Sequence, residues 1–190
     1  MSRLDTLTED DLDDGQRHMW AAVTDSRGQS VVGADGGLIG PFGAWLRSPA
    51  IGEKLAEAGA LLRFSSALEP RLLELVICTV GAHWRSNFEF WAHARLARRA
   101  GVSDEVIDAL AAGREPSLER DEDVVVYRFT QHLLEERRVP DDLYRRAVEL
   151  LGEPGVVDMV CLAGYYSAVS LTLNVFQVPL PVGERPLWPE

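Results

Sequence analysis

The sequence predicts an all-α protein, and three observations lead to this fold class. Prolines and glycines divide the 190 residues into segments of helical length, and several of these carry apolar residues at spacings of three and four. Residues that suit helix N-caps precede some of the segments. No stretch alternates apolar and polar residues between hairpin turns, so no strand is expected.

The N-terminal part predicts one helix followed by a long connector. Residues 6–24 are expected to be helical, because Thr8 can act as the N-cap and the apolar residues after it share one face. Residues 26–45 are rich in glycine and contain Pro41, which breaks regular structure. A connector of this length is often functional, so we expect a loop that can lie over a pocket.

Four helices are expected in the middle of the chain. Proline is tolerated in the first turn of a helix, and two prolines mark the starts of helices over about 50–63 and 70–83. The next helix, 86–100, stops at Gly101, which suits the left-handed backbone that closes helices. A short helix over 103–113 follows.

The C-terminal part predicts three helices and an extended tail. A charged linker leads into a helix over 122–137, and a helix over 140–152 precedes a long apolar helix over 154–176. Residues 177–190 are rich in proline and are expected to run extended along a neighbouring surface. The length of the chain fits one domain, residues 1–190.

Composition narrows the classes of function. The formal net charge is −11, which argues against a protein that binds the nucleic-acid backbone through clustered Lys and Arg. The apolar run 156–178 contains Asp158 and other polar residues and has no basic flanks, so a buried or interface helix is expected rather than a membrane span. Two cysteines and no apolar signal-peptide core favour a cytoplasmic location.

The helix predicted over 70–83 carries the first polar residues of interest. Arg71, Glu74 and Cys78 lie near one face of it, at spacings of three and four. Glu74 stands in an apolar run, where a carboxylate is unfavourable unless it is paired or protonated. We therefore expect Glu74 to have a partner, which Arg71 or another subunit could supply.

The helix predicted over 86–100 carries a second polar group. Ser86, Glu89 and His93 follow one another at spacings of three and four, with Asn87 beside them. Glu89 and His93 can form an acid–base pair. Alternatively, Ser86 and Glu89 form a capping box and His93 is a satisfied interhelical histidine. The spacing lacks the specificity of a two-histidine zinc motif, so no metal site is predicted.

The same region resembles a known family. The segment EPRLLELVICTVGAHWRSNFEFWAHARLARRAGVSDEVIDAL, with the flanks GPFGAWLRSP and GYYSAVSLTLNVFQVPLP, is similar to the carboxymuconolactone decarboxylase superfamily, which includes the alkylhydroperoxidase D-type proteins. The resemblance covers most of residues 38–182. It implies a multihelical bundle of the alkylhydroperoxidase D type and a homo-oligomer, for which the apolar C-terminal helix and the tail offer an interface.

The hydroperoxidase branch of this family uses two cysteines that this chain lacks. Its pattern of Glu, Cys, Cys and His falls here on Glu74, Ser86, Glu89 and His93, so the nucleophilic thiol and its resolving partner are both absent. Peroxidase chemistry would have to use Cys78 alone, whose thiolate the nearby Glu74 disfavours.

The decarboxylase branch implies a lyase that releases carbon dioxide from a lactone acid without a cofactor. In that interpretation His93 is the acid or base, and Glu74 and Glu89 orient it or shuttle protons. Such a substrate is itself an acid, and its expected contacts are Arg71, Arg85, Ser86 and Asn87. Two alternatives stay open: peroxiredoxin-type activity through one cysteine, and a catalytically silent helical oligomer that binds a small ligand.

Overall fold

The computed structural model describes residues 2–189, and among these every regular element is helical. Two isolated bridges, Thr8 to Gly37 and Val32 to Leu38, are the β pairings in this part of the chain. Two 3₁₀ turns, η1 and η2, flank the first helix. In chain order the elements are η1 (Glu9–Asp11), α1 (Asp14–Arg27), η2 (Gln29–Val31), α2 (Pro41–Trp45), α3 (Pro49–Phe64), α4 (Pro70–His83), α5 (Asn87–Arg99), α6 (Asp104–Ala111), α7 (Asp121–Glu135) and α8 (Asp141–Val175).

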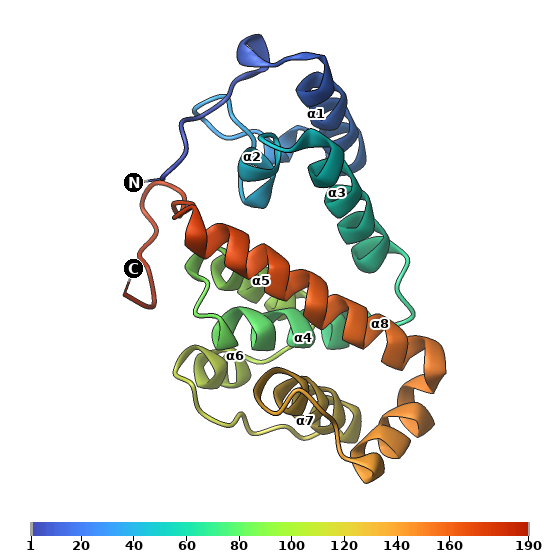
Figure 1. The fold of residues 1–190 in the computed structure, drawn as a ribbon. Coiled ribbons are helices and arrows are strands. Elements are labelled where there is room, and N and C mark those ends of the chain that lie inside the picture. The colour runs from blue at the N-terminus through green and yellow to red at the C-terminus, as the bar shows by residue number, and fades with distance from the viewer. Residues whose placement is uncertain (1, 190) are drawn as a thin grey trace.

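The helices form two parts, an N-terminal group and a bundle (Figure 1). The N-terminal group consists of α1, α2 and α3, in which α3 packs against both others. The bundle surrounds α4, which packs against α5, α7 and α8, and every residue of α4 from Arg71 to Gly81 is buried. Helix α8 joins the two parts because it also contacts α2 and α3. The all-α prediction is confirmed.

The first helix begins later than the sequence suggested. Thr8 and Asp11 form a capping box, but it closes only the 3₁₀ turn η1. Leu12 is then extended, and a second capping box between Asp13 and Gln16 starts α1 at Asp14. The prediction of a helix over 6–24 was therefore wrong at its start, because two caps compete within six residues.

The connector over 26–45 contains two short elements that its glycines concealed. Gly28 ends α1 with a positive φ, η2 follows, and Gly40 with φ of 63° precedes α2 at Pro41. A side chain on Gly40 would press on the ring of Phe88, 3.2 Å from the site of its Cβ. Glycine is thus required here for both backbone conformation and close packing.

Helix α8 is two helices joined at a kink, as the sequence predicted. Gly152 adopts φ of 71° and Pro154 follows it, which interrupts the backbone hydrogen bonds. The apolar part of α8 is long enough to cross a membrane, with a mean hydropathy of 1.5, but 44% of that window is buried inside the protein. Asp158 in this part accepts hydrogen bonds from Ser66 and Ala67. These contacts fit the central helix of a bundle.

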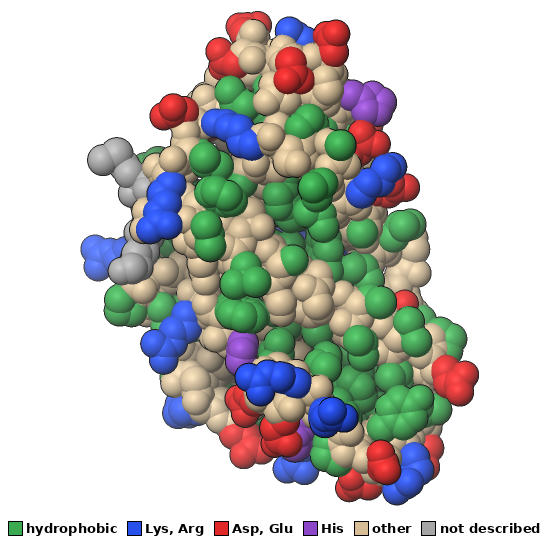
Figure 2. Space-filling view, viewed as in Figure 1, with side chains coloured by type: hydrophobic (Ala, Val, Ile, Leu, Met, Phe, Trp, Pro, Cys, Tyr) green, Lys and Arg blue, Asp and Glu red, His purple; other side chains and the backbone are tan. Residues whose placement is uncertain are grey.

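One face of α3 and α8 exposes apolar side chains, which gather across the middle of the molecule in Figure 2. Cys161 is also exposed on α8. The homo-oligomer expected from the sequence stays a prediction. The large exposed apolar residues of this face are Ile51, Leu61, Phe64, Val157, Val160, Leu171 and Val175.

Candidate active site

His93 lies between two buried glutamates at the point where α4 and α5 face each other. Its Nδ1 is 2.7 Å from Oε2 of Glu74, and its Nε2 is 3.1 Å from Oε1 of Glu89. All three side chains are less than a tenth exposed. We call Glu74, Glu89 and His93 the His93 cluster. The structure thus brings together all three residues that the sequence predicted to be catalytic.

The two glutamates hold His93 differently. Glu74 makes an aligned hydrogen bond with Nδ1, which fixes the ring. Oε1 of Glu89 is close to Nε2 but makes no hydrogen bond of good geometry and has no other partner. Burial raises the pKa of Glu89, while His93 and Arg63 act in the opposite direction. Glu89 is therefore the carboxyl group best suited to hold and release a proton.

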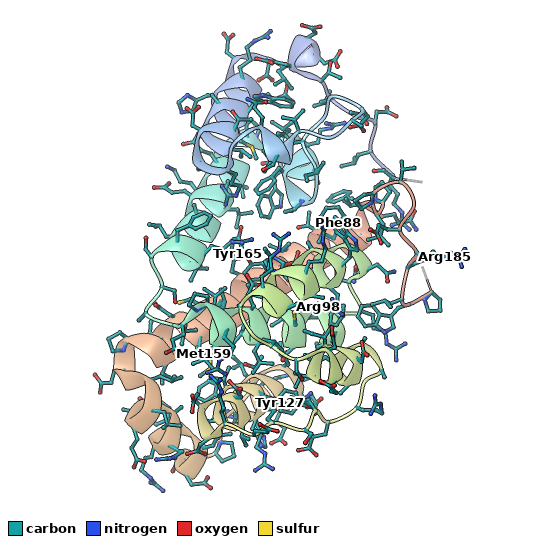
Figure 3. All side chains as sticks on the ribbon, turned by 180° about the vertical axis from the view of Figure 1, so that it is seen from behind. Phe88, Arg98, Tyr127, Met159, Tyr165 and Arg185 are labelled. Carbon is teal, nitrogen blue, oxygen red and sulfur yellow. The ribbon has the colours of Figure 1, made fainter. Side chains whose placement is uncertain are left out.

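A pocket of about 300 Å³ opens beside this cluster, between the N-terminal helices and the bundle. Figure 3 shows Phe88 and Tyr165 on the side of the bundle that faces the N-terminal helices. Glu89 and His93 line the pocket, while Glu74 lies behind His93. The pocket is lined by Arg27, Ser30, Val31, Ile39, Gly40, Pro41, Phe42, Gly59, Arg63, Phe64, Phe88, Glu89, Ala92, His93, Tyr165, Tyr166 and Val169. The connector over 26–45 does lie over a pocket.

Two tyrosines of α8 complete the wall next to His93. The Tyr166 ring meets the His93 ring edge-on, with 5.0 Å between centroids, and Tyr165 packs edge-on against Tyr166. Burial raises the pKa of Tyr165 to about 12, and the pKa of the more deeply buried Tyr166 is also raised well above its usual range. Both hydroxyls therefore stay protonated and can only donate or accept hydrogen bonds.

The four residues expected to bind substrate lie outside this pocket. Arg71 forms ion pairs with Glu69, Glu122 and Asp123. Arg85 is exposed in the turn between α4 and α5 and has a positive φ of 46°. Arg71 and Arg85 thus do not line this pocket, and the arginines of its wall are Arg27 and Arg63.

Ser86 and Asn87 also have other surroundings. The Asn87 amide donates to the carbonyl of Trp188 and accepts from the backbone N–H groups of Leu187 and Trp188, so it holds the C-terminal tail. Ser86 precedes α5 but makes no side-chain cap, and its buried hydroxyl has no partner. The capping box with Glu89 is therefore wrong, because the Glu89 carboxylate turns to His93.

Neither cysteine is placed for reaction in this pocket. Cys78 is 0% exposed in α4, and burial together with Glu74 and Glu89 raises its pKa well above the usual range. Cys161 is exposed on α8 and does not line the pocket. Within residues 2–189, no group of three or more His, Cys, Asp and Glu side chains is arranged to hold a metal ion.

Comparison with known proteins agrees with this geometry. Residues 49–119, which include α3, α4, α5 and α6, match the model of the carboxymuconolactone decarboxylase family. This region of the chain is therefore similar to that family. It contains the complete His93 cluster and Arg63, whereas Arg27 and the two tyrosines lie outside it.

The fold has a counterpart among solved structures. A protein of unknown function from Agrobacterium tumefaciens, proposed to be the antioxidant defence protein AhpD, superposes with a TM-score of 0.65. The match covers 73% of this chain and 96% of that one, at 16% sequence identity, so it supports the fold alone. A search of curated proteins gave no significant match.

The pocket residues that were not predicted have weaker signals in the sequence. Arg27 and Arg63 stand at the C-terminal ends of α1 and α3, where basic residues commonly serve to stabilise helix ends. Tyr165 and Tyr166 fall in an apolar helix, where aromatic residues usually belong to the core. Their common location at a pocket depends on how the N-terminal helices pack against α8.

Proposed function

We propose that this protein is a cofactor-free lyase of the carboxymuconolactone decarboxylase type, which acts on a small acid or lactone by acid–base chemistry. The observation that carries the proposal is His93 held between two buried glutamates at the wall of a pocket with two arginines. The similarity of residues 49–119 to the carboxymuconolactone decarboxylase family supports the class of reaction. A protonated group and an anion-binding group in one small cavity are the two requirements of such a decarboxylation.

The reaction divides between the two kinds of group. An arginine of the pocket holds an oxygen of the substrate and stabilises the charge that develops on it. The carbon–carbon bond to the leaving carboxylate breaks, carbon dioxide departs, and the electron pair stays on the substrate as a carbanion or dienolate. Glu89, whose pKa is raised by burial, or His93 beside it then supplies the proton. Glu74 positions His93 so that Nε2 faces Glu89 and the pocket.

A peroxidase that uses Cys78 has less support. Peroxide must reach a thiolate, and Cys78 is fully buried with a raised pKa. We expect Cys78→Ser to retain the wild-type rate of lactone decarboxylation. A peroxidase rate that is present in the wild type and lost in Cys78→Ser would favour the thiol mechanism instead.

The decisive experiment measures decarboxylation in a His93→Ala variant. Wild type and variant are assayed for carbon dioxide release from carboxymuconolactone and related lactone acids. We expect kcat to fall by about 10²- to 10⁴-fold, the usual contribution of a general acid or base. Circular dichroism and thermal melting verify that the variant is folded.

His18→Ala is the matched control, because His18 is exposed on α1 and pairs only with Glu53. It should keep the wild-type rate. If His93→Ala and Glu74→Gln both retain full turnover, the His93 cluster is not the catalytic site. If the wild type turns over none of these acids, the silent ligand-binding oligomer becomes the better proposal.

A further inference from the structure

The pocket holds a guanidinium group without a carboxylate partner. Among the described residues, no Asp or Glu oxygen lies within ion-pair distance of Arg27. Its NH2 donates to the carbonyl of Ala56 at 2.8 Å and its NH1 to the hydroxyl of Ser26, so neutral oxygens hold it in place. Burial lowers the pKa of Arg27, and Arg63 contributes in the same direction. An anion in the pocket would relieve both effects.

Arg63 adds a second positive charge to the same wall. Its nearest carboxylate oxygen, Oε1 of Glu74, is 3.9 Å away, and that glutamate is already bonded to His93 through its other oxygen. Arg63 thus has one carboxylate at the limit of ion-pair distance, and Arg27 has none among the described residues. In a chain with a net charge of −11, two guanidinium groups with so little carboxylate pairing in one cavity indicate a site for an anionic group.

Aromatic rings form part of the remaining pocket wall. The guanidinium of Arg27 lies over the ring of Phe42 at 4.8 Å and that of Arg63 near the ring of Phe64 at 5.6 Å. Phe88 lines the same cavity. A cavity of about 300 Å³ is at the lower end of the range for ligand pockets, which corresponds to a compound with about one ring.

We propose that this pocket binds a planar, conjugated single-ring carboxylate, with its carboxylate on Arg27 and Arg63 and its ring among the aromatic walls. Aromatic side chains favour contact with a flat unsaturated ring over a puckered saturated one. The inference rests on the proposed function only in that both concern one pocket, and it names the class of acid that the enzyme receives.

Equilibrium binding tests the inference without any turnover. Isothermal titration calorimetry measures the affinity of the His93→Ala protein for benzoate, benzamide and cyclohexanecarboxylate. Benzamide has the ring without the charge, and cyclohexanecarboxylate has the charge without the flat ring. We expect benzoate to bind about tenfold or more tightly than benzamide, as charge-assisted hydrogen bonds predict, and more tightly than cyclohexanecarboxylate.

Variants assign the binding to the named groups. Arg27→Gln and Arg63→Gln should each weaken the binding of benzoate while leaving the binding of benzamide unchanged. Phe64→Leu should reduce the preference for benzoate over cyclohexanecarboxylate. Arg99→Gln, an exposed arginine of α5 outside the pocket lining, is the matched control and should bind benzoate like the wild type. The inference is overturned if benzoate and benzamide bind equally, or if neither arginine variant weakens benzoate.

The two proposals fail in different ways. A His93→Ala protein that binds benzoate as predicted but keeps full turnover contradicts the proposed function alone. If turnover depends on His93 but the affinity for benzoate does not change in Arg27→Gln and Arg63→Gln, this inference alone is contradicted.

Discussion

Helix α4 contributes to two charge clusters, one with residues of α7 and one with residues of α5. The Arg71 cluster joins Arg71 to Glu69, Glu122 and Asp123, and the His93 cluster joins His93 to Glu74 and Glu89. Burial of charge is common to both. The Arg71 cluster ties α4 to α7, whereas two members of the His93 cluster line a pocket.

The two clusters differ in the kind of group at their centre and in access to a cavity. In the Arg71 cluster the centre is a permanent cation surrounded by carboxylates, so its charge is fixed. In the His93 cluster the centre is a titratable ring between two acids, and Glu89 and His93 line the pocket. A buried charge alone therefore does not identify a reactive site. A titratable group beside a cavity does so better.

The largest expected effect on stability is that of Arg71→Met, which removes the cation of the Arg71 cluster. Because Asp123 would remain largely buried without its partner, we expect a loss of about 3–5 kcal/mol in the free energy of unfolding, measured by urea denaturation. Turnover per folded molecule should not change. Arg71→Met with Asp123→Asn should recover part of the loss, and a fall in kcat would show that the two clusters are not separate in role.

Gly59→Ala tests how closely α3 packs against α8 beside the pocket. A Cβ at Gly59 would overlap the hydroxyl oxygen of Tyr165, so Tyr165 or α3 must move. We expect a loss of about 1–3 kcal/mol, as for overpacking, although alanine usually stabilises a helix relative to glycine. Thermal melting measures this loss of stability. A Gly59→Ala, Tyr165→Ala double variant should regain stability relative to Gly59→Ala. A stabilised single variant would contradict this packing.

The Glu89→Gln variant tests whether the His93 cluster titrates, because its stability relative to the wild type should depend on pH. At acid pH, below the ordinary pKa of a glutamate, Glu89 is protonated in both folded and unfolded protein, and the variant should match the wild type. As pH rises, the unfolded state releases this proton before the folded state does, because burial raises the folded pKa. The wild type thus loses stability that the variant keeps. Melting temperatures from about pH 4 to about pH 8 should diverge, and a constant difference would refute the assignment.

The smallest effect is expected for Asn87→Ala, which touches neither cluster. Its side chain makes three hydrogen bonds with the backbone of Leu187 and Trp188, and these lie partly in solvent. We expect about 1 kcal/mol of lost stability and faster limited proteolysis of the tail. kcat should remain at the wild-type value, and a large decrease would restore Asn87 as a substrate contact.

Most of the fold could be predicted because its signals are local. The start of α4 at Pro70, the end of α5 before Gly101 and the break at Gly152 each depend on a residue whose backbone preference is strong. The start of α1 was missed because Thr8 and Asp13 are equally good caps. Choosing between such caps requires the packing of the preceding loop.

The candidate site also contains residues that local signals predicted and residues that they could not predict. The His93 cluster could be predicted because spacing along two adjacent helices brings its members together. Arg27 could not, because it is 66 residues from His93 and reaches the pocket only when α1 packs over the bundle. Asn87 was assigned to substrate because nothing in its own neighbourhood shows that residues a hundred positions later bind it.

The two arginines of the pocket also affect how quickly it fills. An anion that approaches a protein of net charge −11 is first repelled, and it meets attraction only close to Arg27 and Arg63. Dissolved salt screens charges beyond about 10 Å at 0.1 M, so it removes the distant repulsion more than the close attraction. Capture of an anionic compound is therefore faster at moderate ionic strength than in dilute buffer, the reverse of electrostatic steering.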